Sequence, residues 1–422
     1  MNPGAEKSKR RVATAARRET LKRLQENGTL LANELAPRMT GARTGGCLET
    51  WALKPAGDGV VLLWAGERSQ RWRQFAPPAW EPREVPFPAG LDALSVQFSS
   101  SGRWLAACEG WRERRLRIWN WETGRQVAEH QLDHPGPTMS FSADENRLYV
   151  TASLGLILSL PTTAEAGAIQ EIRFESADSF RGLAPHPGGG WLAVECRGRL
   201  GMLELGPPAR LREMSIGGQW DPGATMLREL NKPEFQRKFA ELKERAPAQQ
   251  TYLDELLRLE KQISGKARAV PLERLLALCF TPDGHWLVCG TSEGVRVFDW
   301  AKLIEPEAKA VEWDYAVAAE EPDPELDKYA SRAIHCVGFD SLRQRVLFSG
   351  EEGKLKYLEL GTGRTGELLG APERTPITRF ALSDDRGIIA ITRVEGGHGN
   401  ERRARFQIWS YPALCAAVGL EF

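Results

Sequence analysis

The pattern closest to a known ligand-binding motif is Gly361-Thr-Gly-Arg-Thr-Gly366, which matches G-x-G-x-x-G. A dinucleotide site needs these glycines after a strand and at the start of a helix. Here they follow one short apolar run, and Glu367-Leu-Leu369 behind them also reads as a strand. We therefore expect a hairpin turn at this position, and we expect no bound cofactor.

Two of the six histidines, His130 and His134, lie close together with Asp133 between them. Imidazole and carboxylate groups are ordinary zinc ligands. No further ligand accompanies these three residues, so we expect no metal site. The sequence also lacks the P-loop, H-E-x-x-H and G-x-S-x-G motifs that mark common catalytic centres. The protein is therefore predicted not to be an enzyme.

Basic residues crowd the first part of the chain, where they could contact phosphates and release counterions. They include Lys9, Arg10, Arg11, Arg17 and Arg18. No aromatic side chain is interleaved to stack on bases. A solvated arm is the simpler interpretation, and docking to nucleic acid or to an acidic protein is the alternative. Residues 1–43 are predicted to form a basic extension, partly helical or flexible.

The charge balance of the chain excludes a strong long-range electrostatic attraction of the whole protein to nucleic acid or membrane. The 422 residues carry 56 basic and 56 acidic side chains, giving a formal net charge of zero. No apolar run approaches the roughly 18 residues of a membrane span, and no apolar stretch follows the basic start, so we expect neither membrane binding nor a secretory signal. Seven dispersed cysteines, several inside apolar runs, are typical of reduced thiols and predict a cytoplasmic protein.

The strands that would position any site are predicted by a repeated sequence pattern. An apolar residue, a short polar turn and a second apolar run seven positions later occur at residues 98–105, 141–148 and 280–287. Weaker copies lie at 53–60, 339–346 and 382–389, and one with a longer turn lies at 183–192. Most steps between copies are close to 43 residues, a period typical of a β-propeller with several strands per unit.

Seven copies predict an all-β, seven-bladed propeller over residues 44–422. Two longer steps predict insertions: residues 217–270 between the fourth and fifth blades, and the acidic residues 316–330 between the fifth and sixth. Residues 418–422 are the expected outer strand of the last blade. Both faces of many strands are apolar, which indicates a core between neighbouring blades.

The repeats resemble the WD-repeat family over residues 44–422. The resemblance rests on aromatic residues that end third strands and on the flanking turns, best in Arg117-Ile-Trp119-Asn-Trp-Glu-Thr-Gly124. No Gly-His pair precedes a first strand, so the hydrogen-bond network of the strict family cannot form. The resemblance implies a rigid platform for protein interactions, divergent and of bacterial style.

The insertion at 217–270 is predicted to be a helical hairpin. Apolar residues recur there at helical spacing, including Phe235 and Phe239 in one helix and Tyr252 and Leu256 in the other. Helices this short are not stable alone in water. Their apolar faces therefore need a neighbour, either the propeller itself or a partner protein, and both interpretations remain open.

Both insertions are expected on one face of the ring, together with two long loops between second and third strands. Loops on a rigid scaffold commonly carry function, and aromatic and arginine side chains dominate interfaces. The candidate contacts on these loops are Trp111, Arg112, Arg114, Arg115, Arg402 and Arg403. We predict a non-catalytic scaffold that docks partner proteins in a cytoplasmic, bacterial-type complex. The alternatives are a nucleic-acid-associated subunit that uses the basic arm and, less favoured, an enzyme with its site in the central channel.

Overall fold

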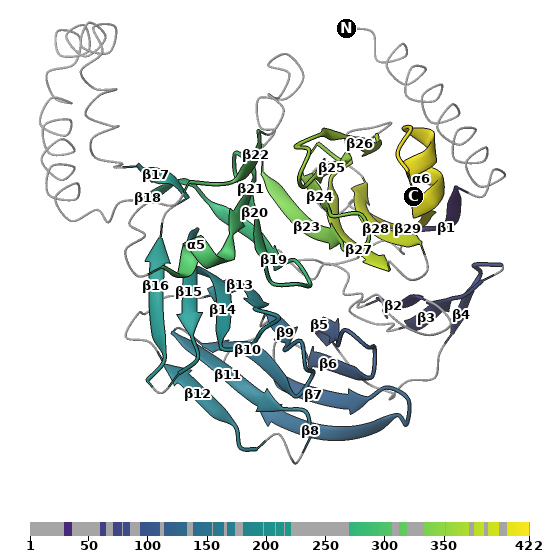
Figure 1. Cartoon of the computed structure of the whole chain (residues 1–422). Helices are drawn as coiled ribbons and strands as arrows, with labels where there is room; N and C mark the ends of the chain where they lie inside the picture. The colour runs from purple at the N-terminus through teal and green to yellow at the C-terminus, as the bar shows by residue number, and fades with distance from the viewer. Residues whose placement is uncertain are drawn as a thin grey trace, which may run out of the picture.

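The structure of the chain is a computed structural model (Figure 1). It describes most of the repeats, with gaps. The described residues are 29–35, 60–64, 71–77, 79–84, 93–109, 114–132, 138–153, 155–163, 167–173, 180–196, 198–206, 208–214, 216–220, 270–305, 312–318, 333–350, 352–370, 375–383, 387–395 and 403–421. Among them, no helix is both long and apolar enough to span a bilayer.

Twisted antiparallel sheets are arranged in a ring (Figure 1). Blade 1 holds β5 (Ala93–Phe98), β6 (Trp104–Glu109), β7 (Arg115–Asn120) and β8 (Arg125–Gln131). Blade 2 holds β9 (Met139–Phe141), β10 (Arg147–Ser153), β11 (Leu156–Pro161) and β12 (Gln170–Arg173). Blade 3 holds β13 (Phe180–Pro185), β14 (Trp191–Cys196), β15 (Arg199–Glu204) and β16 (Arg210–Met214).

The remaining blades follow the same sequential order. Blade 4 holds β19 (Leu275–Phe280), β20 (Trp286–Thr291), β21 (Gly294–Asp299) and β22 (Tyr315–Ala318). Blade 5 holds β23 (Ile334–Asp340), β24 (Arg345–Gly350), β25 (Leu355–Glu359) and β26 (Thr365–Leu369). Blade 6 holds β27 (Ile377–Ser383), β28 (Ile388–Glu395) and β29 (Arg403–Ser410), and its fourth strand is β1 (Leu30–Leu35).

The propeller has six four-stranded blades in the described residues, not the seven predicted. The repeat at residues 53–60 accounts for the difference. It contributes a three-stranded sheet of β2 (Val60–Trp64), β3 (Arg71–Phe75) and β4 (Pro82–Glu84), and the residues just before β2 lie outside the described part. Phe75 of this N-terminal sheet packs against Phe406 of blade 6, with ring centroids 5.5 Å apart.

The ring is closed by a strand from the start of the chain. β1 pairs antiparallel with β29, from Leu30 opposite Trp409 to Leu35 opposite Arg405. Ser410 donates its backbone N–H to the carbonyl of Thr29 at 2.8 Å. The sequence pattern predicts residues 30–35 within the N-terminal extension and residues 418–422 as the outer strand. That expectation was wrong, because β1 occupies the free edge of β29.

Apolar side chains fill the seams between blades, as the sequence predicted. Each described core cluster joins two adjacent sheets. Alternate residues of one strand face opposite seams: Leu192 and Val194 of β14 pack toward blade 2, whereas Ala193 packs toward blade 4. Consequently the second strands β6 and β24 are buried at every position, while β8 at the rim is mostly exposed.

The repeated polar turn joins the first and second strands of each blade. In blade 4 the hydroxyl of Thr281 accepts a hydrogen bond from the backbone N–H of Trp286 at 3.0 Å and contacts the Asp283 carboxylate. Ser142, Arg147 and Asp144 repeat this arrangement in blade 2. The Gly361–Gly366 segment is a hairpin turn between β25 and β26, as predicted, with positive φ at Gly361 and Gly363.

Two short helices follow third strands, and each packs against the blade that precedes its own: the helix of blade 4 against blade 3, and the helix of blade 6 against blade 5. α5 (Trp300–Ile304) begins at the cap Asp299, and α6 (Tyr411–Ala417) begins at the cap Ser410. Trp300 stacks on His186 of blade 3 at 5.4 Å. The helices therefore clamp neighbouring blades together on the face that carries the polar turns.

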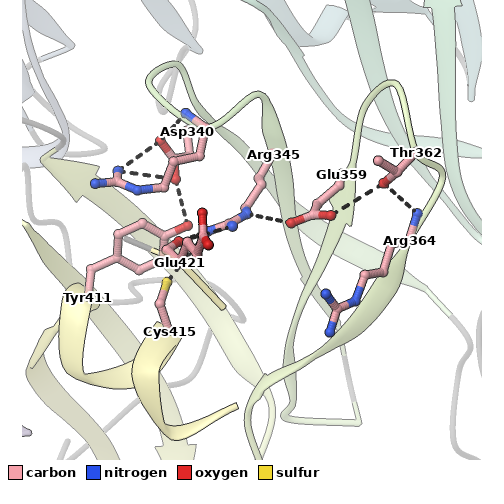
Figure 2. A network of polar contacts seen from close by, with 9 residues as sticks. Asp340, Arg345, Glu359, Thr362, Arg364, Tyr411, Cys415 and Glu421 are labelled. Carbon is pink, nitrogen blue, oxygen red and sulfur yellow. Dashed lines mark hydrogen bonds and ion pairs between the residues drawn. The ribbon is translucent and has the colours of Figure 1, made fainter. Parts of the chain in front are cut away.

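A buried polar network fixes α6 to blade 5 (Figure 2). The hydroxyl of Tyr411 donates to Oδ2 of the fully buried Asp340 at 2.8 Å. Arg345 contacts Glu359 through Nε at 3.1 Å and donates from both Nη atoms to the backbone carbonyl of Glu421, each at 3.1 Å. Burial and the nearby Asp340 charge raise the pKa of Tyr411, so its hydroxyl remains a donor at neutral pH.

The six described cysteines are all free thiols, and Cys47 lies outside the described residues. Burial raises the pKa of Cys279 and that of Cys336 to about 12. These thiols are therefore protonated at neutral pH and serve as small apolar side chains.

Tyr411→Phe should destabilise the protein, because it removes one donor from a buried carboxylate. The expected loss is about 1–3 kcal/mol, measured as a shift of the urea unfolding midpoint. Tyr315→Phe is the matched control, because that partly exposed hydroxyl accepts from the backbone N–H of Gly361 and water can replace it. Equal midpoints for the two variants would contradict the assigned role of Tyr411.

Candidate functional site

The strand order gives the ring two unlike faces. The polar turns between first and second strands, together with α5 and α6, lie on one side, which we call the turn face. Second strands run away from it, so the loops between second and third strands and the connections between blades lie on the other side. We call this side the arm face, because a two-stranded ribbon leaves the ring there (Figure 1).

The ribbon consists of β17 (Ile216–Trp220) and β18 (Val270–Glu273), inserted between blades 3 and 4. Its strands pair antiparallel from Ile216 opposite Glu273 to Trp220 opposite Val270. The predicted helical hairpin at 217–270 therefore starts and ends in this ribbon. The residues between its strands, 221–269, lie outside the described part of the chain, and so do Phe235, Phe239, Tyr252 and Leu256.

A buried ion pair anchors the ribbon to blade 4. Nη2 of Arg296 on β21 lies 2.5 Å from Oε1 of Glu273, and the two side chains are only 9% and 10% exposed. The hydroxyl of Thr291 lies 3.2 Å from Oε2 of the same carboxylate. Because an unpaired buried charge is costly, this pair fixes the end of β18 relative to the blade.

Arg296 is held on further sides. Its Nη1 donates to the carbonyl of Val295 at 3.0 Å, and its guanidinium lies over the ring of Trp313, 4.6 Å from the centroid. Trp313 itself is 39% exposed. The cation therefore joins the ribbon, the third strand and an exposed aromatic side chain of blade 4.

Backbone contacts hold the residues that follow β18. Arg274 and Ser292 exchange hydrogen bonds: the Arg274 N–H donates to the Ser292 hydroxyl at 3.0 Å, and the Ser292 N–H donates to the Arg274 carbonyl at 2.9 Å. Leu275 donates its N–H to the carbonyl of Gly198 in blade 3 at 2.8 Å. Gly198 has a φ of +79°, and a Cβ there would lie 3.3 Å from Cγ of Arg274, so glycine permits this close contact.

The other strand of the ribbon is fixed by apolar packing. Ile216 is 4% exposed and belongs to the core cluster between blades 3 and 4, with Leu275 and Leu303. Burying an isoleucine contributes roughly 1.5–3 kcal/mol. Both strands of the ribbon thus enter the ring at fixed positions on the arm face.

The structure describes the side chains of two of the predicted loop contacts, both in blade 1. Arg114 is exposed and has a φ of +49°. Arg115 lies 3.8 Å from Glu109 and 4.0 Å from Glu129. Glu109 is itself buried and pairs with Arg117 at 2.8 Å. Part of the Arg115 charge is therefore balanced within the blade.

The other predicted contacts are not brought together with these arginines. Arg403 begins β29 of blade 6, opposite Glu395, and its side chain is not described. Trp111, Arg112 and Arg402 lie outside the described residues. The same holds for the basic N-terminal set of Lys9, Arg10, Arg11, Arg17 and Arg18. Their roles remain predictions.

Sequence reasoning missed the Glu273–Arg296 anchor. The sequence does contain an indication of this ion pair, namely a single charged residue inside an apolar strand, Val295-Arg-Val297. A charged residue in such a run is rarely buried without a partner, so Arg296 pointed to a buried acid nearby. The position of that acid depended on the pairing of β17 with β18, which no local pattern showed.

Comparisons with known proteins agree with this architecture. Residues 272–299, which span the first three strands of blade 4, match the family model described as "WD domain, G-beta repeat". The chain is also similar to a solved structure titled "Crystal Structure of Mitotic Checkpoint Complex". The TM-score is 0.55 at 12% identity, and the match covers 91% of this chain and 92% of that one. At this identity the likeness concerns the fold alone. No curated protein matches the chain.

Arg296→Met should destabilise the protein by about 3–5 kcal/mol, because it leaves the Glu273 carboxylate buried without its cation. The double variant Glu273→Leu with Arg296→Met should recover much of that loss in stability, since no unpaired charge then remains buried. Urea unfolding midpoints of the single and double variants test this coupling. A double variant less stable than Arg296→Met alone would contradict the assigned ion pair.

Proposed function

We propose that this β-propeller, whose fourth blade matches a WD-repeat family model, acts as a non-catalytic scaffold that docks partner proteins on its arm face. The observation that carries this proposal is the double anchoring of the β17–β18 ribbon. Ile216 is packed in a core seam, and Glu273 is paired with Arg296. The two strands that lead into and out of the insertion are thus held on the ring, which lowers the entropic cost of binding at that point.

Two further observations support a role in an assembly. The similar solved structure is that of a multi-protein complex, so a ring of this fold takes part in an assembly there. The described cysteines are free thiols, which suits a reducing compartment. We further propose that the scaffold works in a cytoplasmic complex of bacterial type, with Arg114 and Arg115 of blade 1 as additional contacts on the same face.

Replacing residues 221–269 with a short Gly-Ser linker should abolish partner recovery, because the ribbon then presents no docking segment. Quantitative mass spectrometry after affinity capture measures this. Proteins that depend on the arm should fall to background in the linker variant and stay unchanged in Leu342→Ser. Leu342 is 67% exposed in the polar turn of blade 5, on the turn face.

The thermal unfolding midpoint of the linker variant provides the fold control, because both ribbon strands and their anchors are retained. Equal recovery of every protein by wild type and linker variant, at an unchanged midpoint, would refute docking through the arm. Loss of the same proteins in Leu342→Ser would place the docking site on the turn face instead.

A further inference from the structure

A cavity opens on the turn face at the seam between blades 2 and 3. Its volume is about 400 Å³. One wall is the polar turn of blade 2, with Ala143, Asp144 and Asn146, above Tyr149 of β10. The other wall is the turn of blade 3, which includes Pro187. This seam cavity lies on the opposite side of the ring from the ribbon.

At other seams, the polar turn of one blade forms hydrogen bonds with the polar turn of the adjacent blade. Between blades 1 and 2, the Glu145 carboxylate accepts from the hydroxyls of Ser100 and Ser101 at 2.7 and 2.6 Å. Between blades 3 and 4, Nε2 of His186 lies 3.1 Å from the carbonyl of Gly284. At the seam between blades 2 and 3, the same kind of turn instead lines a cavity.

The turns that flank the cavity are held firmly in place. Glu145 keeps a φ of +58°, a conformation that costs energy for a non-glycine residue, and its contacts with blade 1 maintain it. His186 uses both ring nitrogens: Nδ1 accepts from the Gly188 N–H at 3.0 Å, so Nε2 is the nitrogen that donates to Gly284. The histidine is therefore a structural bridge and is not available to a ligand.

The cavity lining carries one carboxylate, Asp144, and one guanidinium, Arg147, and the carboxylate is the more exposed of the two. Asp144 is exposed, and hydrogen bonds, chiefly from the Ser142 hydroxyl, lower the pKa of its carboxyl group, so it is ionised at neutral pH. Arg147 is only partly exposed, and its Nη1 donates to Oγ of Ser159 at 3.1 Å and to the Ala168 carbonyl at 3.4 Å. Its guanidinium is thus engaged by oxygens of blade 2.

The apolar part of the lining suits an alkyl chain. Tyr149 is 8% exposed and contributes its ring, and Pro187 and Ala143 add carbon atoms from the two turns. Long basic side chains bury their methylene stems on such surfaces and keep the charged head in water or beside a carboxylate. A cavity of this size holds one such side chain with the backbone on either side of it.

We propose that the seam cavity binds a lysine or arginine side chain of an extended segment in a partner protein. The cation pairs with Asp144, and the methylene stem lies against Tyr149 and Pro187. This site is separate from the arm face, so it adds a second docking point to the scaffold and does not depend on residues 221–269.

Blade 4 offers a matched control for this site. Asp283 occupies the same turn position as Asp144. Its Oδ1 accepts from the backbone N–H of His285 at 3.0 Å, as that of Asp144 accepts from the Asn146 N–H at 3.1 Å. Hydrogen bonding, chiefly from Thr281, also lowers the pKa of Asp283. Only Asp144 lines the seam cavity.

The test uses a phage-displayed library of random heptapeptides, panned on the immobilised full chain. Enriched peptides should share a lysine or arginine. A fluorescein-labelled copy of the best one should bind Asp144→Asn about tenfold more weakly, the factor that corresponds to about 1.4 kcal/mol. It should bind Asp283→Asn within about twofold of wild type. Ala143→Phe, which fills the cavity from an exposed turn position, should also weaken binding.

Three results would overturn the proposal. They are enrichment without basic residues, equal affinities for Asp144→Asn and Asp283→Asn, and competition by free lysine as effective as that by the peptide. The linker variant lacking residues 221–269 should bind the labelled peptide normally. Failure of the seam site and failure of the arm site are therefore distinguishable.

Discussion

Apolar contact between neighbouring sheets is the constraint on which the whole structure depends. A second strand such as β24 is buried at every position, because its alternate side chains pack in two different seams. No blade can bury both faces alone, so each needs a neighbour on either side. The ring must therefore close, and the first and last parts of the chain must meet. β1 achieves this by pairing with β29.

Closure also explains why the two faces differ. On the turn face, α5, α6 and the bridges between polar turns fasten adjacent blades, and the network around Asp340 and Arg345 (Figure 2) ties the last blade to the one before it. The arm face carries the ribbon, held by Ile216 and by the Glu273–Arg296 pair. One face stabilises the ring, and the other is available to present an inserted segment.

Local patterns located six of the blades correctly, but they overcounted by one and gave no sign of how the ring closes. Second strands stand out because they are continuously apolar, so β6, β10 and β20 lie where the repeated sequence pattern placed them. β1 could not be found this way, since its partner strand lies 370 or more residues away and pairing across the chain leaves no local signal. Helix α6 did have a signal, Ser410 as cap with Pro412 in the first turn. Ribbon pairing and the charge balance around Arg115 also depend on tertiary contacts.

Hydrogen exchange followed by mass spectrometry tests closure by β1 most directly. The amides of residues 30–35 that face β29 should exchange far more slowly than those of an unstructured segment, because the two strands share a ladder and Leu30 is only 1% exposed in the core. Exchange of residues 30–35 within seconds, while β29 stays protected, would show that the start of the chain is a free arm and would contradict the account.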